Sequence, residues 1–241
     1  MTVRFAATSS REQLAQAGRL LAEVPDLYLQ THLAETREEV AWIAGLFPEA
    51  RSYLDVYARH GLLGPRSVFA HGIWLDAADR AALSQAGACI AHCPGSNLFL
   101  GSGLLDWRAL QAAGVAVALA TDVGGGTSLS MTRAMAQAYE IQALQGLRLS
   151  AWSLLHAATR GAASALRLER EIGSLEAGCS ADLVVWRWSE GRVQDWRQAN
   201  ASELHERVFA WMILATQANR LETWVAGQRL GGETTTPAEA R

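Results

Sequence analysis

The chain has 241 residues, of which 50% are hydrophobic and 19% are charged, a composition typical of a globular protein with ample material for a core. Its formal net charge of −3 provides no attraction for polyanions and argues against nucleic acid as a partner. No stretch approaches the about 20 apolar residues that span a bilayer, and the N-terminus lacks the basic-then-apolar pattern of a secretory signal. A membrane is therefore not an expected partner.

The three cysteines, Cys89, Cys93 and Cys179, form no CxxC pair and no even-numbered disulfide framework. Unpaired thiols are typical of a reducing compartment, so we expect a cytoplasmic protein. We interpret the cysteines as small apolar residues, and none shows the features of a nucleophile.

Short apolar runs alternate with helical segments along the first half of the chain. The predicted strands are Val3–Ala7, Leu27–Leu33, Ser67–Ile73, Ala88–Cys93 and Val115–Thr121. The helices predicted between them are Arg11–Glu23, Glu38–Phe47, Leu54–Arg59, Ala77–Ala86 and Leu105–Ala113. This alternation predicts right-handed crossovers and a parallel sheet with helices packed outside it.

The second half begins with two long helical stretches, Met131–Gln145 and Ala151–Leu166. After a turn-like segment at Ile172–Gly178, we expect a strand, a Trp-rich helix and a hairpin around Gly227, at Asp182–Trp188, Glu203–Gln217, Glu222–Ala226 and Gln228–Leu230. The polar, Thr-rich tail Gly231–Arg241 is predicted to be disordered. We therefore divide the chain into a partial barrel (1–170), C-terminal helices and β strands (171–230) and a tail (231–241).

Five βα units are fewer than the eight that close a (β/α)8 barrel. A chain that opens directly on a strand is therefore expected to form the second half of such a barrel, about strands 4 to 8. A complete open α/β sheet is the alternative fold, and the motifs at the strand ends bear on the choice.

The predicted strand ends carry residues typical of metal sites. The second strand leads into His32 and Glu35, the third ends at His71, the fourth at His92 and the fifth at Asp122. Because the carboxyl ends of parallel strands meet at one edge of the sheet, these side chains are expected to share a site. Imidazole and carboxylate groups are common ligands of zinc.

Each of these residues has a chemical and a structural interpretation. His32 is a candidate metal ligand, Glu35 a candidate proton shuttle beside a metal-bound water, and His71 a donor that holds that water. Asp122 follows an uncharged strand and needs a partner, for which a metal is the simplest choice. The alternatives are structural histidines at His32 and His71, a carboxylate favoured by a helix dipole at Glu35, and a loop cap at Asp122.

The other histidines carry weaker signals. His92 either orients a ligand through a hydrogen bond or makes a purely structural one, and both interpretations stay open. His60 precedes Gly61 at a predicted helix end and is expected to accompany a C-terminal cap. His156 and His205 lie within predicted helices and are expected to be structural.

In their order and spacing, these residues resemble the motifs of strands five to eight in deaminases of the amidohydrolase superfamily, at His32–Glu35, Ala70–Gly72, His92–Asn97 and Thr121–Asp122. The segment Ile172–Val185 resembles the return of the superfamily's chain into its small composite β domain. Within the superfamily the guanine deaminases are the most similar, through Val3–Ala6, Thr31–Val40, Tyr53–Tyr57 and Thr121–Met131.

The resemblance implies one Zn²⁺ ion per active site, with His32 and Asp122 as metal ligands, Glu35 as the proton shuttle and His71 in contact with the attacking water. Asp122 also holds that water. The same resemblance implies that Arg4, through its carbonyl oxygen, and Phe5, against the ring, bind a purine beside His32, Glu35 and Asp122. The implied reaction is the hydrolytic deamination of guanine to xanthine and ammonia, in a family that is usually homodimeric.

The sequence departs from the family pattern in one respect. The family carries a His-x-His pair at the end of its first barrel strand that supplies two further metal ligands, and this sequence contains no His-x-His. The resemblance therefore predicts a truncated chain, whose His32 and Asp122 are too few for tight zinc binding. Two alternatives stay open. One is a related aminohydrolase acting on 8-oxoguanine, cytosine or a triazine, and the other is a non-catalytic remnant.

Overall fold

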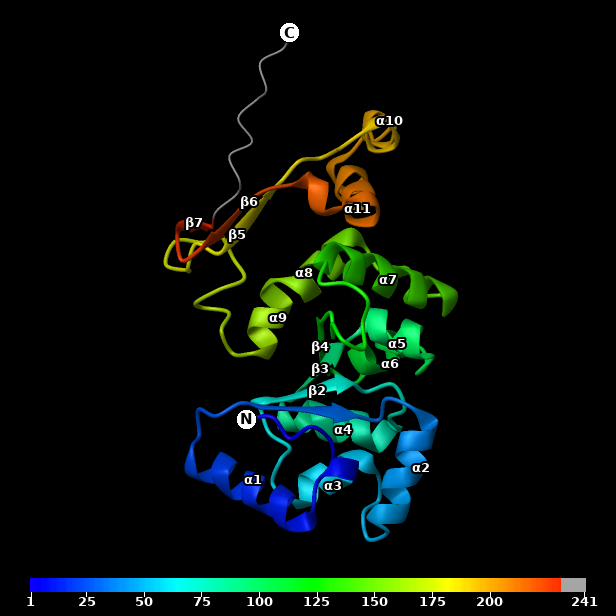
Figure 1. The fold of residues 1–241 in the computed structure, drawn as a ribbon, viewed down its shortest axis with the longest axis vertical. Helices are drawn as coiled ribbons and strands as arrows, with labels where there is room; N and C mark the ends of the chain where they lie inside the picture. Colours follow the sequence, from blue (N-terminus) through cyan, green and yellow to red (C-terminus); the bar gives the residue numbers. More distant parts are fainter. Residues whose placement is uncertain (231–241) are drawn as a thin grey trace.

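Four parallel strands form the main sheet of the computed structural model, which describes residues 1–230 (Figure 1). They pair in chain order and are β1 (Leu29–Leu33), β2 (Ser67–His71), β3 (Cys89–His92) and β4 (Ala116–Leu119). The register pairs Leu33 with His71 and His92 with Leu119, so neighbouring strands end at the same level. The predicted α/β class with a parallel sheet is confirmed.

Helices connect each strand to the next and cover the sheet (Figure 1). They are α1 (Arg11–Glu23), α2 (Arg37–Leu46), α3 (Tyr53–Arg59), α4 (Ala77–Ala86), α5 (Pro94–Leu100) and α6 (Trp107–Ala112). Helices α1 and α4 begin and end at the predicted residues. Their caps explain this agreement, because Ser10 and Asp76 each accept a backbone N–H of the first turn and Gly87 ends α4 in the left-handed conformation.

The C-terminal part forms a second layer of helices and a small antiparallel sheet. Its elements are α7 (Met131–Leu144), α8 (Ala151–Ala158), α9 (Arg160–Ala165), β5 (Leu183–Trp186), α10 (Arg192–Ala199), α11 (Leu204–Leu214), the 3-10 turn η2 (Gln217–Asn219), β6 (Arg220–Val225) and β7 (Gln228–Leu230). Helix α11 packs against α7 and α8 (Figure 1). The predicted hairpin at Gly227 is present, with positive φ at Ala226 and Gly227. The predicted tail 231–241 lies outside the described residues, and the proposed domain limits stay predictions.

The strand predicted at Val3–Ala7 is wrong. The segment runs beside β1 through a single bridge between Thr2 and Gln30 and a hydrogen bond from the His32 N–H to the Arg4 carbonyl. At Phe5 the chain turns into the 3-10 helix η1 (Ala6–Thr8), because the Phe5 carbonyl accepts from the Thr8 N–H. The turn removes the segment from the sheet directly after its hydrogen bonds with β1.

The helices also differ from the prediction in four places. Helix α5 was not expected after His92, but proline is well suited to the first turn of a helix because it needs no partner for an N–H, and Pro94 starts this one. The predicted stretch Ala151–Leu166 divides at Thr159, whose φ of −130° and ψ of −103° are not helical. Helix α6 starts at Trp107 rather than Leu105, because Asp106 caps it, and α10 was not predicted at all.

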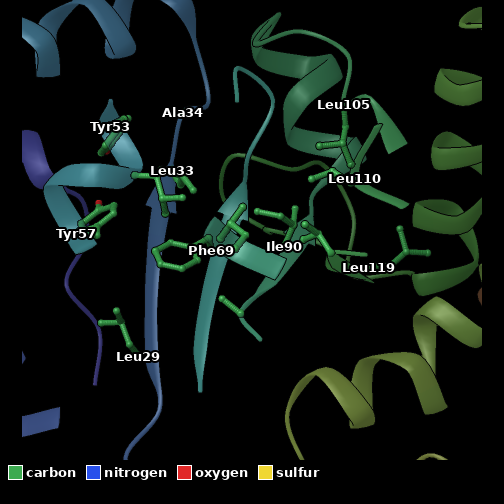
Figure 2. Packing of buried hydrophobic residues seen from close by; sticks show 14 of the residues in the cluster. Leu29, Leu33, Ala34, Tyr53, Tyr57, Phe69, Ile90, Leu105, Leu110 and Leu119 are labelled. Carbon is green, nitrogen blue, oxygen red and sulfur yellow. The ribbon is translucent and has the colours of Figure 1, made fainter. Parts of the chain in front are cut away.

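The core lies between the sheet and its helices (Figure 2). Leu29 and Leu33 of β1, Phe69 of β2 and Ile90 of β3 are all fully buried. Tyr57 of α3 joins them, and its hydroxyl donates to the His32 carbonyl at 2.9 Å and accepts from the Ala6 N–H at 3.0 Å. This buried hydroxyl therefore fixes the segment before α1 against the end of β1.

None of the helices within residues 1–230 has the length and apolar character needed to cross a bilayer.

Two helical glycines give a stability prediction with a built-in control. A methyl group on Gly18 of α1 would lie 1.8 Å from the His60 carbonyl oxygen, whereas one on Gly45 of α2 would meet nothing within 4 Å. We expect Gly18→Ala to destabilise the fold by about 1–3 kcal/mol through steric overlap. Gly45→Ala should be neutral or stabilise by up to about 1 kcal/mol. Urea unfolding of both variants tests this, and equal effects would contradict it.

Candidate active site

The chain changes direction sharply where three of the strands end. Ala34, directly after β1, has φ 48°, His71, the last residue of β2, has φ 71°, and Asp122, after β4, has φ 47°. A left-handed backbone is costly for residues other than glycine and persists where the surrounding structure enforces it, which is common at functional sites. The three turns lie beside Glu35, His71 and Asp122, three of the predicted site residues.

The imidazoles of His32 and His71 lie together at this edge of the sheet. Their rings stack with centroids 5.3 Å apart and an interplanar angle of 29°. The His32 Nδ1 lies 2.7 Å from the Arg4 carbonyl oxygen, and the His71 Nδ1 lies 2.9 Å from Oδ1 of Asn97. Both oxygens are acceptors, so each Nδ1 carries the proton, and each Nε2 presents the lone pair that a metal or a donor needs.

The carboxylate of Glu35 is held next to His71. One oxygen accepts a hydrogen bond from the Ser102 hydroxyl at 2.8 Å, and the other lies 3.5 Å from the His71 Nε2. The Trp74 indole in turn donates to the Ser102 carbonyl at 3.0 Å. The Glu35 side chain keeps 18% of its surface exposed, so it can reach a bound substrate while its orientation is fixed.

A tight glycine loop presents Asp122. The Gly126 N–H donates to the Asp122 carbonyl at 2.5 Å, and a methyl group on Gly126 would lie 2.2 Å from the Thr121 carbonyl oxygen. A methyl on Gly125 would lie 3.1 Å from the Asp122 Oδ2. The Gly126 position therefore requires glycine for the loop to close, and a side chain at Gly125 would crowd the Asp122 carboxylate.

The residues expected to bind a purine lie next to His32. The Phe5 ring centroid is 6.2 Å from that of His32 and 6.2 Å from that of Trp42, and the Arg4 guanidinium lies 5.6 Å from the Phe5 centroid. The Arg4 carbonyl oxygen accepts from the backbone and the ring of His32. That oxygen is therefore engaged within the protein, and the predicted contact of this carbonyl with the purine stays a prediction.

His92 is buried beside the site. It is fully inaccessible, and neither ring nitrogen has a hydrogen-bond partner among the described residues. Trp107 meets its ring edge-to-face at 5.9 Å. Burial, with a smaller contribution from His71, lowers the pKa of His92 to about 3. Both roles considered for His92 need a hydrogen bond, and neither ring nitrogen makes one within the described part of the chain.

His60 does cap α3 as expected, with Nδ1 2.7 Å from the Val56 carbonyl.

The low pKa of His92 predicts a loss of stability in mild acid. The unfolded chain takes up a proton near the ordinary pKa of about 6.5, whereas the folded chain resists protonation of His92 down to about 3. The stabilisation is thus complete above pH 6.5 and is lost as the pH falls toward 3, by up to about 1.4 kcal/mol per pH unit. Replacing His92 by leucine should flatten the free energy of unfolding between pH 4 and 6.5, and an unchanged slope would contradict this assignment.

Two contacts of the site were not predicted from the sequence. Ser102 and Asn97 fix Glu35 and His71 through single hydrogen bonds. Ser102 stands between Gly101 and Gly103, and Asn97 closes the segment His92–Asn97. The glycines were the available signal for Ser102, because glycine on both sides of a polar residue allows a close backbone approach.

The donors at this edge fit a divalent metal of the zinc type. His71, Cys93 and Asp122 offer ligand atoms that all lie within 4.8 Å of one another, and His32 stacks on His71. Imidazole nitrogen, thiolate sulfur and carboxylate oxygen are the ligands that zinc takes in proteins. The buried His71 Nε2, which has no hydrogen-bond partner among residues 1–230, is a polar atom that such an ion would satisfy.

A sheet of parallel strands with histidines and a carboxylate at its carboxyl edge is an arrangement typical of the metal sites of (β/α)8 barrels. The model of the amidohydrolase family matches residues 1–230, and the chain belongs to this family. Guanine deaminase from Escherichia coli (strain K12) is 40% identical over 228 residues, which make up 95% of this chain and 52% of that protein. The chain spans about half the length of the curated relatives it matches.

Solved structures show the same similarity. The E. coli guanine deaminase structure matches with a TM-score of 0.93 and 40% identity, covering 95% of this chain and 53% of that one. A guanine deaminase from C. acetobutylicum with bound guanine matches with a TM-score of 0.84 at 25% identity, over 95% of this chain and 54% of that one. An adenosine deaminase from Xanthomonas campestris with bound zinc matches with a TM-score of 0.81 at 29% identity, over 92% and 49%.

Proposed function

We propose that this chain takes part in the hydrolytic deamination of guanine to xanthine and ammonia. The observation that carries the proposal is the convergence of His32, Glu35, His71 and the Asp122 loop at one edge of the sheet. The 40% identity to guanine deaminase from E. coli supports guanine as the substrate. The bound guanine of the C. acetobutylicum relative supports it further.

The metal of the proposed site is one zinc ion. His32 and Asp122 would hold it, and two further histidines are expected from the family's His-x-His pair, which this sequence does not contain. A bound zinc ion would supply Lewis acidity that lowers the pKa of a bound water to about 7. The zinc-bound adenosine deaminase from Xanthomonas campestris supports this choice of metal.

The residues of this chain have separate tasks in the proposed reaction. Glu35 accepts a proton from the attacking water and passes it to a ring nitrogen of the purine, then accepts the proton of the new hydroxyl and passes it to the departing amino group. This role suits a carboxylate oriented by Ser102 and still partly exposed. The Asp122 carboxylate and the His71 Nε2 position the attacking oxygen by hydrogen bonds. The water oxygen then becomes the new ring carbonyl, and the amino group leaves as ammonia.

Purine binding is assigned to Arg4 and Phe5. The Phe5 ring is supported by Trp42 at 6.2 Å and offers an aromatic face for a flat base. Because the Arg4 carbonyl is engaged by His32, we assign the contact with the purine oxygen to the Arg4 guanidinium. A cytoplasmic location and a homodimer complete the proposal.

A substrate panel tests the proposed function. The purified full chain, kept in excess zinc because His32 and Asp122 alone are too few for tight binding, is assayed with guanine, 8-oxoguanine, cytosine and an amino-triazine, following ammonia release and xanthine formation. We expect turnover of guanine above the others and loss of turnover in Asp122→Asn. A preference for another ring would reassign the substrate. Absence of all turnover together with less than one zinc per chain would show a non-catalytic protein.

A further inference from the structure

We propose that Trp74 is a positioning residue of the reaction, which holds the Glu35 carboxylate ready for proton transfer by acting through Ser102. The inference rests on the proposed function, because it takes Glu35 as the residue that moves the proton. Trp74 lies between β2 and α4 and was not among the predicted site residues. Three sets of contacts connect its side chain and backbone to Glu35.

The Ser102 hydroxyl is the direct link to the carboxylate. Ser102 is 4% exposed, and its hydroxyl donates to the Glu35 Oε1 at 2.8 Å. A hydrogen bond to an ionised oxygen is about twice as strong as one between neutral groups. Because Ser102 engages Oε1, the proton from the attacking water is assigned to Oε2, the oxygen that lies 3.5 Å from the His71 Nε2.

The Trp74 indole holds the backbone of Ser102. Its Nε1 donates to the Ser102 carbonyl at 3.0 Å, while the Ser102 N–H donates to the Asn97 carbonyl at 2.9 Å. The ring also packs against the next residue, since a methyl group on Gly103 would lie 2.7 Å from the Trp74 Cζ2. The indole therefore supplies one of the two backbone hydrogen bonds that set the direction of the Ser102 hydroxyl.

Trp74 is also attached to the loop that carries Glu35. Its backbone N–H donates to the Ala34 carbonyl at 3.1 Å, and the Arg37 guanidinium lies 3.8 Å from the centroid of its ring. A cation over the face of a tryptophan is attracted by the negative face of the ring. Ala34 directly precedes Glu35 and Arg37 follows it by two residues, so Trp74 bridges the backbone around Glu35 and the hydroxyl that orients its side chain.

This bridge matters because Glu35 has to serve two proton transfers from one position. Its side chain is partly exposed, and without Ser102 it is free to turn toward solvent. A reacting group displaced by about 1 Å costs on the order of 10²-fold in rate. Loss of the indole N–H alone should cost less than loss of the hydroxyl, because the bond from Ser102 to the Asn97 carbonyl remains.

A double-mutant cycle on the full chain in excess zinc tests the proposal. Trp74→Phe keeps an aromatic ring beneath Arg37 but has no N–H to donate, and Ser102→Ala has no hydroxyl. We expect kcat for guanine to fall about 10-fold in Trp74→Phe and about 10²-fold in Ser102→Ala, with KM within about twofold. Because Trp74 acts through Ser102, the double variant should be no slower than Ser102→Ala. Losses that multiply, or an unchanged kcat in Trp74→Phe, would overturn the proposal.

Trp196→Phe is the matched control for the tryptophan substitution. Trp196 is 68% exposed on α10, and the same chemical change there should leave kcat and KM within about twofold of the wild type. An equal loss of kcat in Trp196→Phe would show that the effect at Trp74 is not specific to the bridge.

Crystal structures of the wild type, Trp74→Phe and Ser102→Ala give a measurement that needs no turnover. In both variants the Glu35 carboxylate should move away from the His71 Nε2, while the His71 Nδ1 keeps its bond to Asn97. A Glu35 side chain that stays in place in Trp74→Phe would overturn the inference alone. A displaced Glu35 in the variants, together with no guanine turnover by the wild type, would overturn the proposed function and leave the positioning of Glu35 by Trp74 standing.

Discussion

Glu35→Gln is expected to lower kcat for guanine by about 10²–10⁴-fold, with a much smaller change in KM. The substitution keeps the shape of the side chain and its hydrogen bond to Ser102, but a neutral amide cannot accept a proton from water. Because proton transfer occurs in the transition state and contributes little to substrate binding, the loss falls on kcat. Steady-state kinetics on the zinc-loaded chain, with xanthine as the measured product, gives both constants.

Glu38→Gln is the matched control for this substitution. This substitution makes the same chemical change three residues further along the chain. Glu38 lies in the first turn of α2, where its side chain is exposed to solvent. It should keep kcat within about twofold of the wild type. A Glu35→Gln enzyme that retains more than about a tenth of the activity would remove Glu35 from the proton-transfer role.

Ser102 explains why the position of Glu35 is not visible in the sequence alone. The spacing from His32 to Glu35 shows that a carboxylate follows the strand, and the structure shows which way it points. That direction depends on a hydroxyl 67 residues away, delivered by the loop after α5 and held by the Trp74 indole. Contacts of this kind arise from the tertiary approach of two loops, which no local pattern encodes.

Two capped helices, α1 and α4, were located correctly at both ends from the sequence. Helices α1 and α4 match the predicted limits because Ser10 and Asp76 stand directly before them and make the expected hydrogen bonds. The predicted strand at Val3–Ala7 failed because its residues have strand propensity, while the turn at Phe5 depends on hydrogen bonds made by its own carbonyl. Local propensity is a weak guide where a few backbone contacts decide the path.

Cys93 shows the same limit within the site. Its apolar interpretation is correct as far as burial is concerned, since the side chain is 2% exposed. Burial and the nearby Asp122 charge raise the pKa of the Cys93 thiol to about 12, so the free protein holds it as a thiol. Only the spatial grouping with His71 and Asp122 distinguishes it from Cys89, which is equally buried at the other end of β3.

Phe69→Ala is expected to lower the free energy of unfolding by about 3–5 kcal/mol, the largest stability effect of any single change considered. Phe69 is fully buried in the middle of the sheet, opposite Thr31 of β1 and Ile90 of β3. Its ring packs against Tyr57, with centroids 5.7 Å apart (Figure 2). Removing the ring leaves a cavity that two neighbouring strands and α3 cannot close without breaking their register. Urea unfolding followed by circular dichroism measures the change.

Phe99→Ala provides the surface comparison, because Phe99 is 67% exposed at the end of α5 and its removal should cost no more than about 0.5 kcal/mol. Equal effects of the two variants would mean that the buried Phe69 ring contributes no more to stability than an exposed ring does.

The Phe69 substitution should also affect the site, since Phe69 lies two residues before His71 on β2. A strand loosened at Phe69 would shift the His71 imidazole away from Asn97 and Asp122, so Phe69→Ala should weaken metal binding together with stability, whereas Phe99→Ala should change neither.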